Sequence, residues 1–176
     1  MNLEVNIIMN YHKIVYDDQL NGEGLRVTLF VSGCGHHCKG CHNPQTWDDR
    51  SGKLFDEKAK KELFELASKD YISGITLSGG DPLYWNNMYG AFDILTDYKV
   101  KFPDKNTWLY TGYTYEQIIK SPILMTIMRY VDVLVDGKFI KELADFNYKW
   151  AGSTNQRIID MQESIKQNKL VLYKSR

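Results

Sequence analysis

Residues 25–41 read Leu-Arg-Val-Thr-Leu-Phe-Val-Ser-Gly-Cys-Gly-His-His-Cys-Lys-Gly-Cys, so a short apolar segment runs directly into a loop that holds three cysteines. The first seven residues are mostly β-branched, aromatic or aliphatic, and such segments favour a strand. Ser32-Gly33 marks the end of this predicted strand. The cysteines therefore follow its carboxyl end, at one edge of the sheet that the strand joins.

Three further strands are predicted, at residues 75–77, 108–110 and 131–137. Helical patterns fill the segments between them, from Asp56 to about Lys69, around Met88–Leu95 before Pro103, from the capping box at Thr114, and over residues 123–130. Alternating strands and helices predict an α/β fold with a mainly parallel sheet and right-handed crossovers. The nearly continuous apolar run at 131–135 is typical of a strand covered on both faces.

Polar or glycine-bearing segments follow the end of each predicted strand. After the cysteine loop they are Gly79-Gly80-Asp81, Thr111-Gly112 and Asp136-Gly137. In parallel α/β sheets, ligands bind beyond the carboxyl ends of the strands. The sequence therefore predicts one binding site where these four segments converge.

The three cysteines of the chain, Cys34, Cys38 and Cys41, have the spacing C-x3-C-x2-C. An odd and crowded set indicates metal ligation or thiol chemistry in a reducing compartment, because a disulfide framework needs an even number. This spacing lets one loop wrap several thiolates around a compact centre. Three thiolates leave one iron of a cubane iron–sulfur cluster without a protein ligand.

Two other interpretations of the cysteines stay open at this point. Together with His36, His37 or His42 they could form a structural zinc site of three cysteines and one histidine, although zinc ligands usually come in two separated pairs. A catalytic thiol is the second alternative.

The composition is typical of a globular chain, since 43% of the 176 residues are hydrophobic and 25% are charged. This length fits one domain, residues 1–176, and is short for a complete eight-stranded barrel. Lys plus Arg and Asp plus Glu number 22 each, without a basic block, so nucleic acid is not an expected partner. No segment reaches the roughly 18 apolar residues of a membrane span, and Glu4 stands where a signal peptide is basic. We therefore expect a cytoplasmic protein without a membrane partner.

The C-x3-C-x2-C pattern after the first strand, followed by Gly-Gly-Asp-Pro after the second, resembles the radical S-adenosylmethionine superfamily. Within it, the chain is most similar to the family that activates anaerobic ribonucleoside-triphosphate reductase. The segments that carry this closer resemblance run through nearly the whole chain, at residues 10–11, 33–47, 76–83, 110–113, 132–139 and 152–157.

The resemblance implies that Cys34, Cys38 and Cys41 form the catalytic centre by ligating three irons of a 4Fe-4S cluster. The fourth iron would take the amino and carboxylate groups of S-adenosylmethionine. The cofactor-binding residues that it implies are Gly40, Cys41, His42, Gly79, Gly80, Asp81 and Asp136.

These implied roles differ along the chain. The Gly-Gly-Asp segment would bind the methionine amino group, largely through backbone carbonyls that glycine leaves accessible. The two residues that flank the last cysteine would lie against adenine. Asp136 would hold ribose or cluster-side contacts, or else be a turn residue before Gly137. Asn155 and Arg157 are interpreted by default as surface residues, with a late loop near the cofactor or the partner as the alternative.

The implied reaction begins with reductive cleavage of S-adenosylmethionine, which releases methionine and a 5′-deoxyadenosyl radical. The radical then removes hydrogen from one glycine of the partner, anaerobic ribonucleoside-triphosphate reductase, with a flavodoxin-like or ferredoxin-like protein as electron donor. An incomplete TIM-like β/α barrel would suit this reaction, because its open side admits a glycine loop from another protein. The alternatives are another glycyl-radical activase, a radical enzyme acting on a small molecule, or, from a different class, a zinc-binding interaction module.

Overall fold

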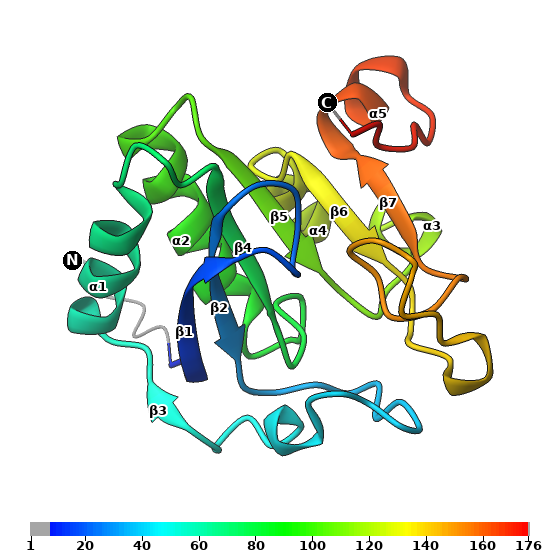
Figure 1. Ribbon diagram of the computed structural model, residues 1–176, viewed down its shortest axis with the longest axis horizontal. Helices are drawn as coiled ribbons and strands as arrows, with labels where there is room; N and C mark the ends of the chain where they lie inside the picture. The colour runs from blue at the N-terminus through cyan, green and yellow to red at the C-terminus, as the bar shows by residue number, and fades with distance from the viewer. Residues whose placement is uncertain (1–7, 176) are drawn as a thin grey trace.

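The computed structural model describes residues 8–175, whose strands form one sheet in the order β3-β1-β2-β4-β5-β6-β7 (Figure 1). The strands are β1 (Asn10–Asp18), β2 (Arg26–Val31), β3 (Lys53–Leu54), β4 (Gly74–Gly79), β5 (Asn106–Tyr110), β6 (Val133–Asp136) and β7 (Arg157–Asp160). The helices are α1 (Glu57–Ala67), α2 (Met88–Lys101), α3 (Tyr115–Ile118), α4 (Pro122–Met128) and α5 (Met161–Gln167), with 3-10 turns η1 (Pro44–Thr46) and η2 (Lys141–Leu143). Glu4, which the signal-peptide argument uses, lies outside the described residues.

The four central strands β2, β4, β5 and β6 are parallel, which confirms the predicted sheet. The outer strands β1, β3 and β7 run antiparallel to their neighbours, and the sequence analysis did not predict them. Within residues 8–175 the sheet is open, with β3 and β7 at its ends. The fold is therefore mixed α/β with an open sheet. The expected incomplete TIM-like barrel is not confirmed by this hydrogen-bonding pattern.

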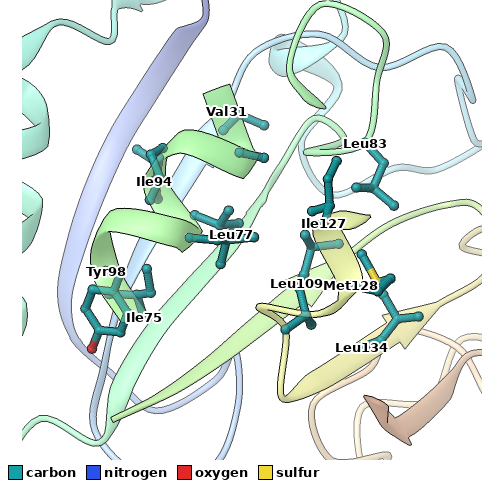
Figure 2. Close-up of a cluster of buried hydrophobic side chains, with 14 of the residues drawn as sticks. Val31, Ile75, Leu77, Leu83, Ile94, Tyr98, Leu109, Ile127, Met128 and Leu134 are labelled. Atoms are coloured by element: carbon teal, nitrogen blue, oxygen red, sulfur yellow. The ribbon is translucent and has the colours of Figure 1, made fainter. Parts of the chain in front are cut away.

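Helices α1, α2 and α4 pack on one face of the sheet. Their buried residues share a single apolar core with alternate residues of the central strands, such as Leu77 and Leu109. Figure 2 shows Ile94 and Tyr98 of α2 beside residues of β4, and Met128 of α4 beside those of β5 and β6. Because each parallel strand is added on the same side of the last one, right-handed crossovers place these helices on a common face.

Local sequence signals fix where two helices begin. The Asp56 carboxylate accepts a hydrogen bond from the Ala59 amide at 2.9 Å and caps α1. In the predicted capping box of α3, the Thr114 amide donates to the Gln117 side chain at 2.9 Å. Both predicted helix starts are confirmed. Among residues 8–175, no helix has the length and apolar character of a membrane span.

Loops cover the opposite face of the sheet, and aromatic residues hold them there. Trp108 of β5 is fully buried and packs edge-to-face against Trp150 and Tyr173, with 5.3 Å between ring centroids in each pair. The Tyr173 hydroxyl also contacts the Glu23 carboxylate. The end of the chain therefore contacts both the loop between β1 and β2 and the loop that follows η2.

Candidate functional site

The three cysteines lie in the loop after β2, and all of them line one open cavity of about 1080 Å³. In Figure 1 this loop (blue to cyan) and the segment after β6 (gold) lie along the same side of the sheet. The cavity is also lined by the predicted segments after β4, β5 and β6, through Gly79, Gly80, Thr111, Gly112 and Gly137. The predicted convergence of the four segments at one cavity is confirmed, and its role as a binding site stays a prediction.

Backbone hydrogen bonds hold the two ends of the cysteine loop. The Gly33 amide donates to the Thr46 carbonyl at 2.7 Å, which ties the start of the loop to η1. Further along, the Cys41 amide donates to the Cys38 carbonyl at 3.0 Å and closes a turn. Gly40 in this turn has a φ of +75°, a conformation that favours glycine. The loop therefore brings its thiols together over a short stretch of chain.

Burial makes two of these thiols weaker acids than an ordinary cysteine. It raises the pKa of Cys34 to about 11, and it raises the pKa of Cys38 as well. Near neutral pH both thiols keep their protons unless a metal stabilises the thiolate form. Three half-buried sulfurs along one cavity fit a cationic iron centre, whose uptake would displace those protons.

The three histidines of the loop each contact another group. His37 stacks on Trp47 and His42 packs beside Phe139, with 4.8 Å between ring centroids in both pairs, while His36 contacts a carboxylate of the β4 segment. Within the described part of the chain, no three His, Cys, Asp or Glu side chains surround a common point suited to one ion.

The segment after β4 divides its roles between backbone and side chain. Gly79 and Gly80 line the cavity, and a Cβ on Gly80 would overlap the Gly33 carbonyl, so this segment touches the cysteine loop. The Asp81 carboxylate is only 1% exposed, lies outside the cavity lining, and accepts a hydrogen bond from the Thr111 hydroxyl at 2.9 Å. The segment therefore exposes its glycine backbone to the cavity, whereas the Asp81 carboxylate serves internal hydrogen bonds.

Asp136 is also 1% exposed and outside the lining of the large cavity. Its carboxylate accepts hydrogen bonds from the Tyr115 amide at 2.6 Å and from Arg157 Nε at 3.0 Å. Arg157 also donates to both Glu116 oxygens, at 2.9 and 2.8 Å. These hydrogen bonds lower the pKa of Glu116 to about 2 and raise that of Arg157. The sequence analysis took a surface position as the default for Arg157 and did not predict this network, because the partners of Arg157 are distant in sequence.

The residues that flank Cys41 lie differently. His42 lines the cavity together with Phe139, and the two rings form one wall. Gly40 lies outside the lining and packs against the Lys141 side chain. The wall that this part of the site offers to a planar ligand is therefore built by His42 and Phe139.

The far wall of the cavity comes from two loops that the sequence analysis did not single out. Leu20 lies in the loop between β1 and β2, Phe146 lies after η2, and these side chains are 82% and 97% exposed. Trp150 also lines the cavity with a left-handed φ of +61°, and the Tyr110 hydroxyl donates to its carbonyl at 2.7 Å. No sequence motif marks these residues, because only the folded chain brings the two loops to one cavity.

Comparison with known proteins gives two kinds of match. A family model described as a 4Fe-4S single cluster domain matches residues 20–159. The chain is also similar to proteins named anaerobic ribonucleoside-triphosphate reductase-activating protein. The one from Enterobacteria phage T4 is 46% identical over 150 residues, which are 85% of this chain and 93% of the relative. The one from Vibrio cholerae is 43% identical over 152 residues, 85% of this chain and 97% of the relative. The one from Escherichia coli K12 is 39% identical over 150 residues, 84% of this chain and 96% of the relative.

Proposed function

This chain belongs to the family of anaerobic ribonucleoside-triphosphate reductase-activating proteins, and we propose that it is the enzyme that generates a glycyl radical on such a reductase. The observation that carries the proposal is the convergence of Cys34, Cys38 and Cys41 with two glycine-rich strand ends at one cavity. When bound by these thiolates, a 4Fe-4S cluster supplies the electron for reductive cleavage of S-adenosylmethionine.

The residues around the thiols would bind and orient S-adenosylmethionine. Gly79 and Gly80 line the cavity without side chains, so their backbone can approach the methionine amino group. His42 and Phe139 form an aromatic wall that suits the adenine ring. Asp81 and Asp136 would support this cofactor through the segments that they fix, since their carboxylates are buried in internal hydrogen bonds.

We take the sheet to be an incomplete TIM-like barrel whose inner face is the one without helices. Phe30, Ser78 and Tyr110 come from three neighbouring strands and line the cavity on this face. We place its opening between the loops that carry Leu20 and Phe146, because these two apolar residues line the cavity and are exposed. A glycine-bearing segment of the reductase would enter here and shield the reacting groups from water.

The reductase contact can be tested with a double variant, Leu20→Ser and Phe146→Ser. Both side chains lie beside the proposed entrance. We therefore expect the affinity for the reductase to fall about tenfold, which is typical when interface side chains that contribute moderately to binding are truncated. Tyr71→Ser, which alters an exposed tyrosine that does not line the cavity, is the control. Unchanged affinity in the double variant would place the entrance elsewhere.

A flavodoxin-like or ferredoxin-like protein is the proposed electron donor, and the cytoplasm is the proposed location. The donor is inferred from the family resemblance alone, and the location is inferred from the reducing conditions that keep three thiols unpaired.

The central experiment is anaerobic. The protein is reconstituted with iron and sulfide, reduced and mixed with S-adenosylmethionine, and 5′-deoxyadenosine is quantified. We expect product from the wild type and from Lys39→Ala, a change at an exposed residue of the same loop, and none from Cys41→Ala. A verified, reducible 4Fe-4S preparation that gives no product, even with reductase present, would overturn the proposal. A colourless protein with one tightly bound zinc would instead support an interaction module.

A further inference from the structure

His36 lies between two of the cysteines and lines the cavity, yet most of its side chain is buried. It is only 12% exposed, whereas His37 and His42 in the same loop are exposed. Its Nε2 atom lies 2.8 Å from Oδ2 of Asp81. Because a carboxylate only accepts hydrogen bonds, the imidazole is the donor in this contact.

The carboxylate that receives this bond is already fixed to the neighbouring strand ends. Asp81 accepts from the Leu83 amide at 2.8 Å, from the Thr111 hydroxyl at 2.9 Å and from the Gly112 amide at 3.0 Å. Asp81 therefore joins the segments after β4 and β5, and His36 connects the cysteine loop to both.

The position of the imidazole is also fixed by shape. The ring packs edge-to-face on Tyr113, with 4.7 Å between centroids and 77° between planes. It lies directly over Gly112, where a Cβ would overlap the ring atoms of His36. The missing side chain at Gly112 therefore provides the space that the imidazole occupies.

The backbone hydrogen bonds of the loop and the His36 side chain hold different parts of the loop. The backbone hydrogen bonds anchor the start of the loop at Gly33 and at Cys34, whose amide donates to the Trp47 carbonyl at 3.1 Å, and they close the turn from Cys38 to Cys41. The stretch between Cys34 and Cys38 reaches the neighbouring strand ends through His36.

We propose that His36 is a positioning residue, which holds Cys34 and Cys38 in place against the ends of β4 and β5 before any cofactor binds. This inference deepens the proposed function and rests on it, because the thiols matter as cluster ligands. It concerns the hydrogen bond to Asp81 and the packing over Gly112.

The first test measures how fast the thiols of cofactor-free protein are alkylated under reducing, anaerobic conditions. His36→Leu keeps much of the bulk but loses the donor, and we expect faster alkylation of Cys34 and Cys38 by about 2–10-fold, as the loss of one hydrogen bond allows. His36→Gln retains an N–H donor and should restore most of the protection. His37→Asn, at a neighbouring residue with a φ of +46° that asparagine tolerates, is the matched control.

A second variant perturbs the same contact from the other side. Gly112→Ala leaves His36 and Asp81 unchanged but places a methyl group where the imidazole lies. It should reproduce the alkylation rates of His36→Leu, and the double variant should be no faster than either single one, because both remove one interaction. Urea unfolding of each variant separates local loosening of the loop from global loss of stability.

The reconstituted proteins supply an independent readout. In His36→Leu and Gly112→Ala we expect a broadened electron paramagnetic resonance signal of the reduced cluster, whereas His36→Gln and His37→Asn should resemble the wild type. Alkylation rates and spectra of His36→Leu that match those of His37→Asn would overturn the proposal. A wild type that takes up no cluster would contradict the proposed function, and the alkylation series would still decide whether His36 holds the loop.

Discussion

Two buried aspartates at the same edge of the sheet are held by different chemistry. Asp81 follows β4 and Asp136 ends β6, and each is 1% exposed. Asp81 is surrounded by a hydroxyl, backbone amides and His36, whereas Asp136 binds the guanidinium of Arg157. The cysteine side of the site therefore depends on short, directional hydrogen bonds, and the side after β6 depends on a permanent charge pair. Only the second should respond strongly to salt, since screening acts on charges that reach solvent.

The largest effect is expected from Asp136→Ala. This change leaves the positive charge of Arg157 paired with Glu116 alone. It also removes the carboxylate that accepts a hydrogen bond from the Tyr115 amide. Because Arg157 is one-third exposed, we expect a loss of about 2–3 kcal/mol of unfolding free energy, at or below the lower end for a broken buried ion pair. Urea unfolding of cofactor-free protein measures it, with the exposed Asp70→Ala as control. A loss of unfolding free energy as small as that of the control would contradict the claim that the Asp136–Arg157 pair stabilises this side of the site.

Asp81→Asn should cost less, about 1.5 kcal/mol, because one acceptor oxygen becomes a donor beside groups that themselves donate. The affected donors are His36 and Gly112 if Oδ2 is replaced, or the Leu83 amide if Oδ1 is replaced, and the Thr111 hydroxyl lies 2.9 Å from both oxygens. Urea unfolding at low and at high sodium chloride should give nearly the same loss. A loss that shrinks markedly in high salt would break the distinction between the two aspartates.

Arg157→Lys tests the Asp136–Arg157 pair without removing its charge. Lysine keeps the charge but cannot reproduce the paired hydrogen bonds to Glu116 together with those to Asp136. We expect a loss of about 1 kcal/mol at low salt, from the hydrogen bonds that lysine cannot form. Thermal and urea unfolding at two salt concentrations test this, and a loss that grows with salt would contradict it.

The smallest effect is expected from Glu116→Gln, because Glu116 is 56% exposed and exposed pairs contribute only about 0.5 kcal/mol. Its folded pKa of about 2 lies below the ordinary value of about 4.3. The stabilisation is therefore fully present above about pH 5 and is lost as pH falls toward 2. Unfolding of both proteins across this range should show the wild-type advantage shrinking. An advantage that grows on acidification would contradict the assignment.

Much of the fold follows from local sequence signals. The central strands and the starts of α1 and α3 are set by apolar runs and capping residues, which act over a few neighbours. The outer strands escaped prediction because β1 is only partly buried and β3 has two exposed residues, so neither carries a clear apolar pattern. Their pairing depends on neighbours that are distant in sequence.

The site divides in the same way. Its convergence could be predicted because the carboxyl ends of parallel strands share one edge. The partners of Asp81 and Asp136 could not, because the contacts with His36 and Arg157 exist only after the chain folds. Phe146 is exposed, lines the cavity and lies in a loop without a sequence motif. Its position at the cavity could therefore not be predicted from the sequence.

The contacts of Tyr173 have a consequence for the range of proteins that this activase accepts. Its ring packs on Trp108, which in turn packs on Trp150, and its hydroxyl contacts Glu23. The two loops beside the proposed entrance are thereby linked through Tyr173. Changes at Tyr173 are therefore a route to widen or narrow the proposed entrance without altering the cysteine loop.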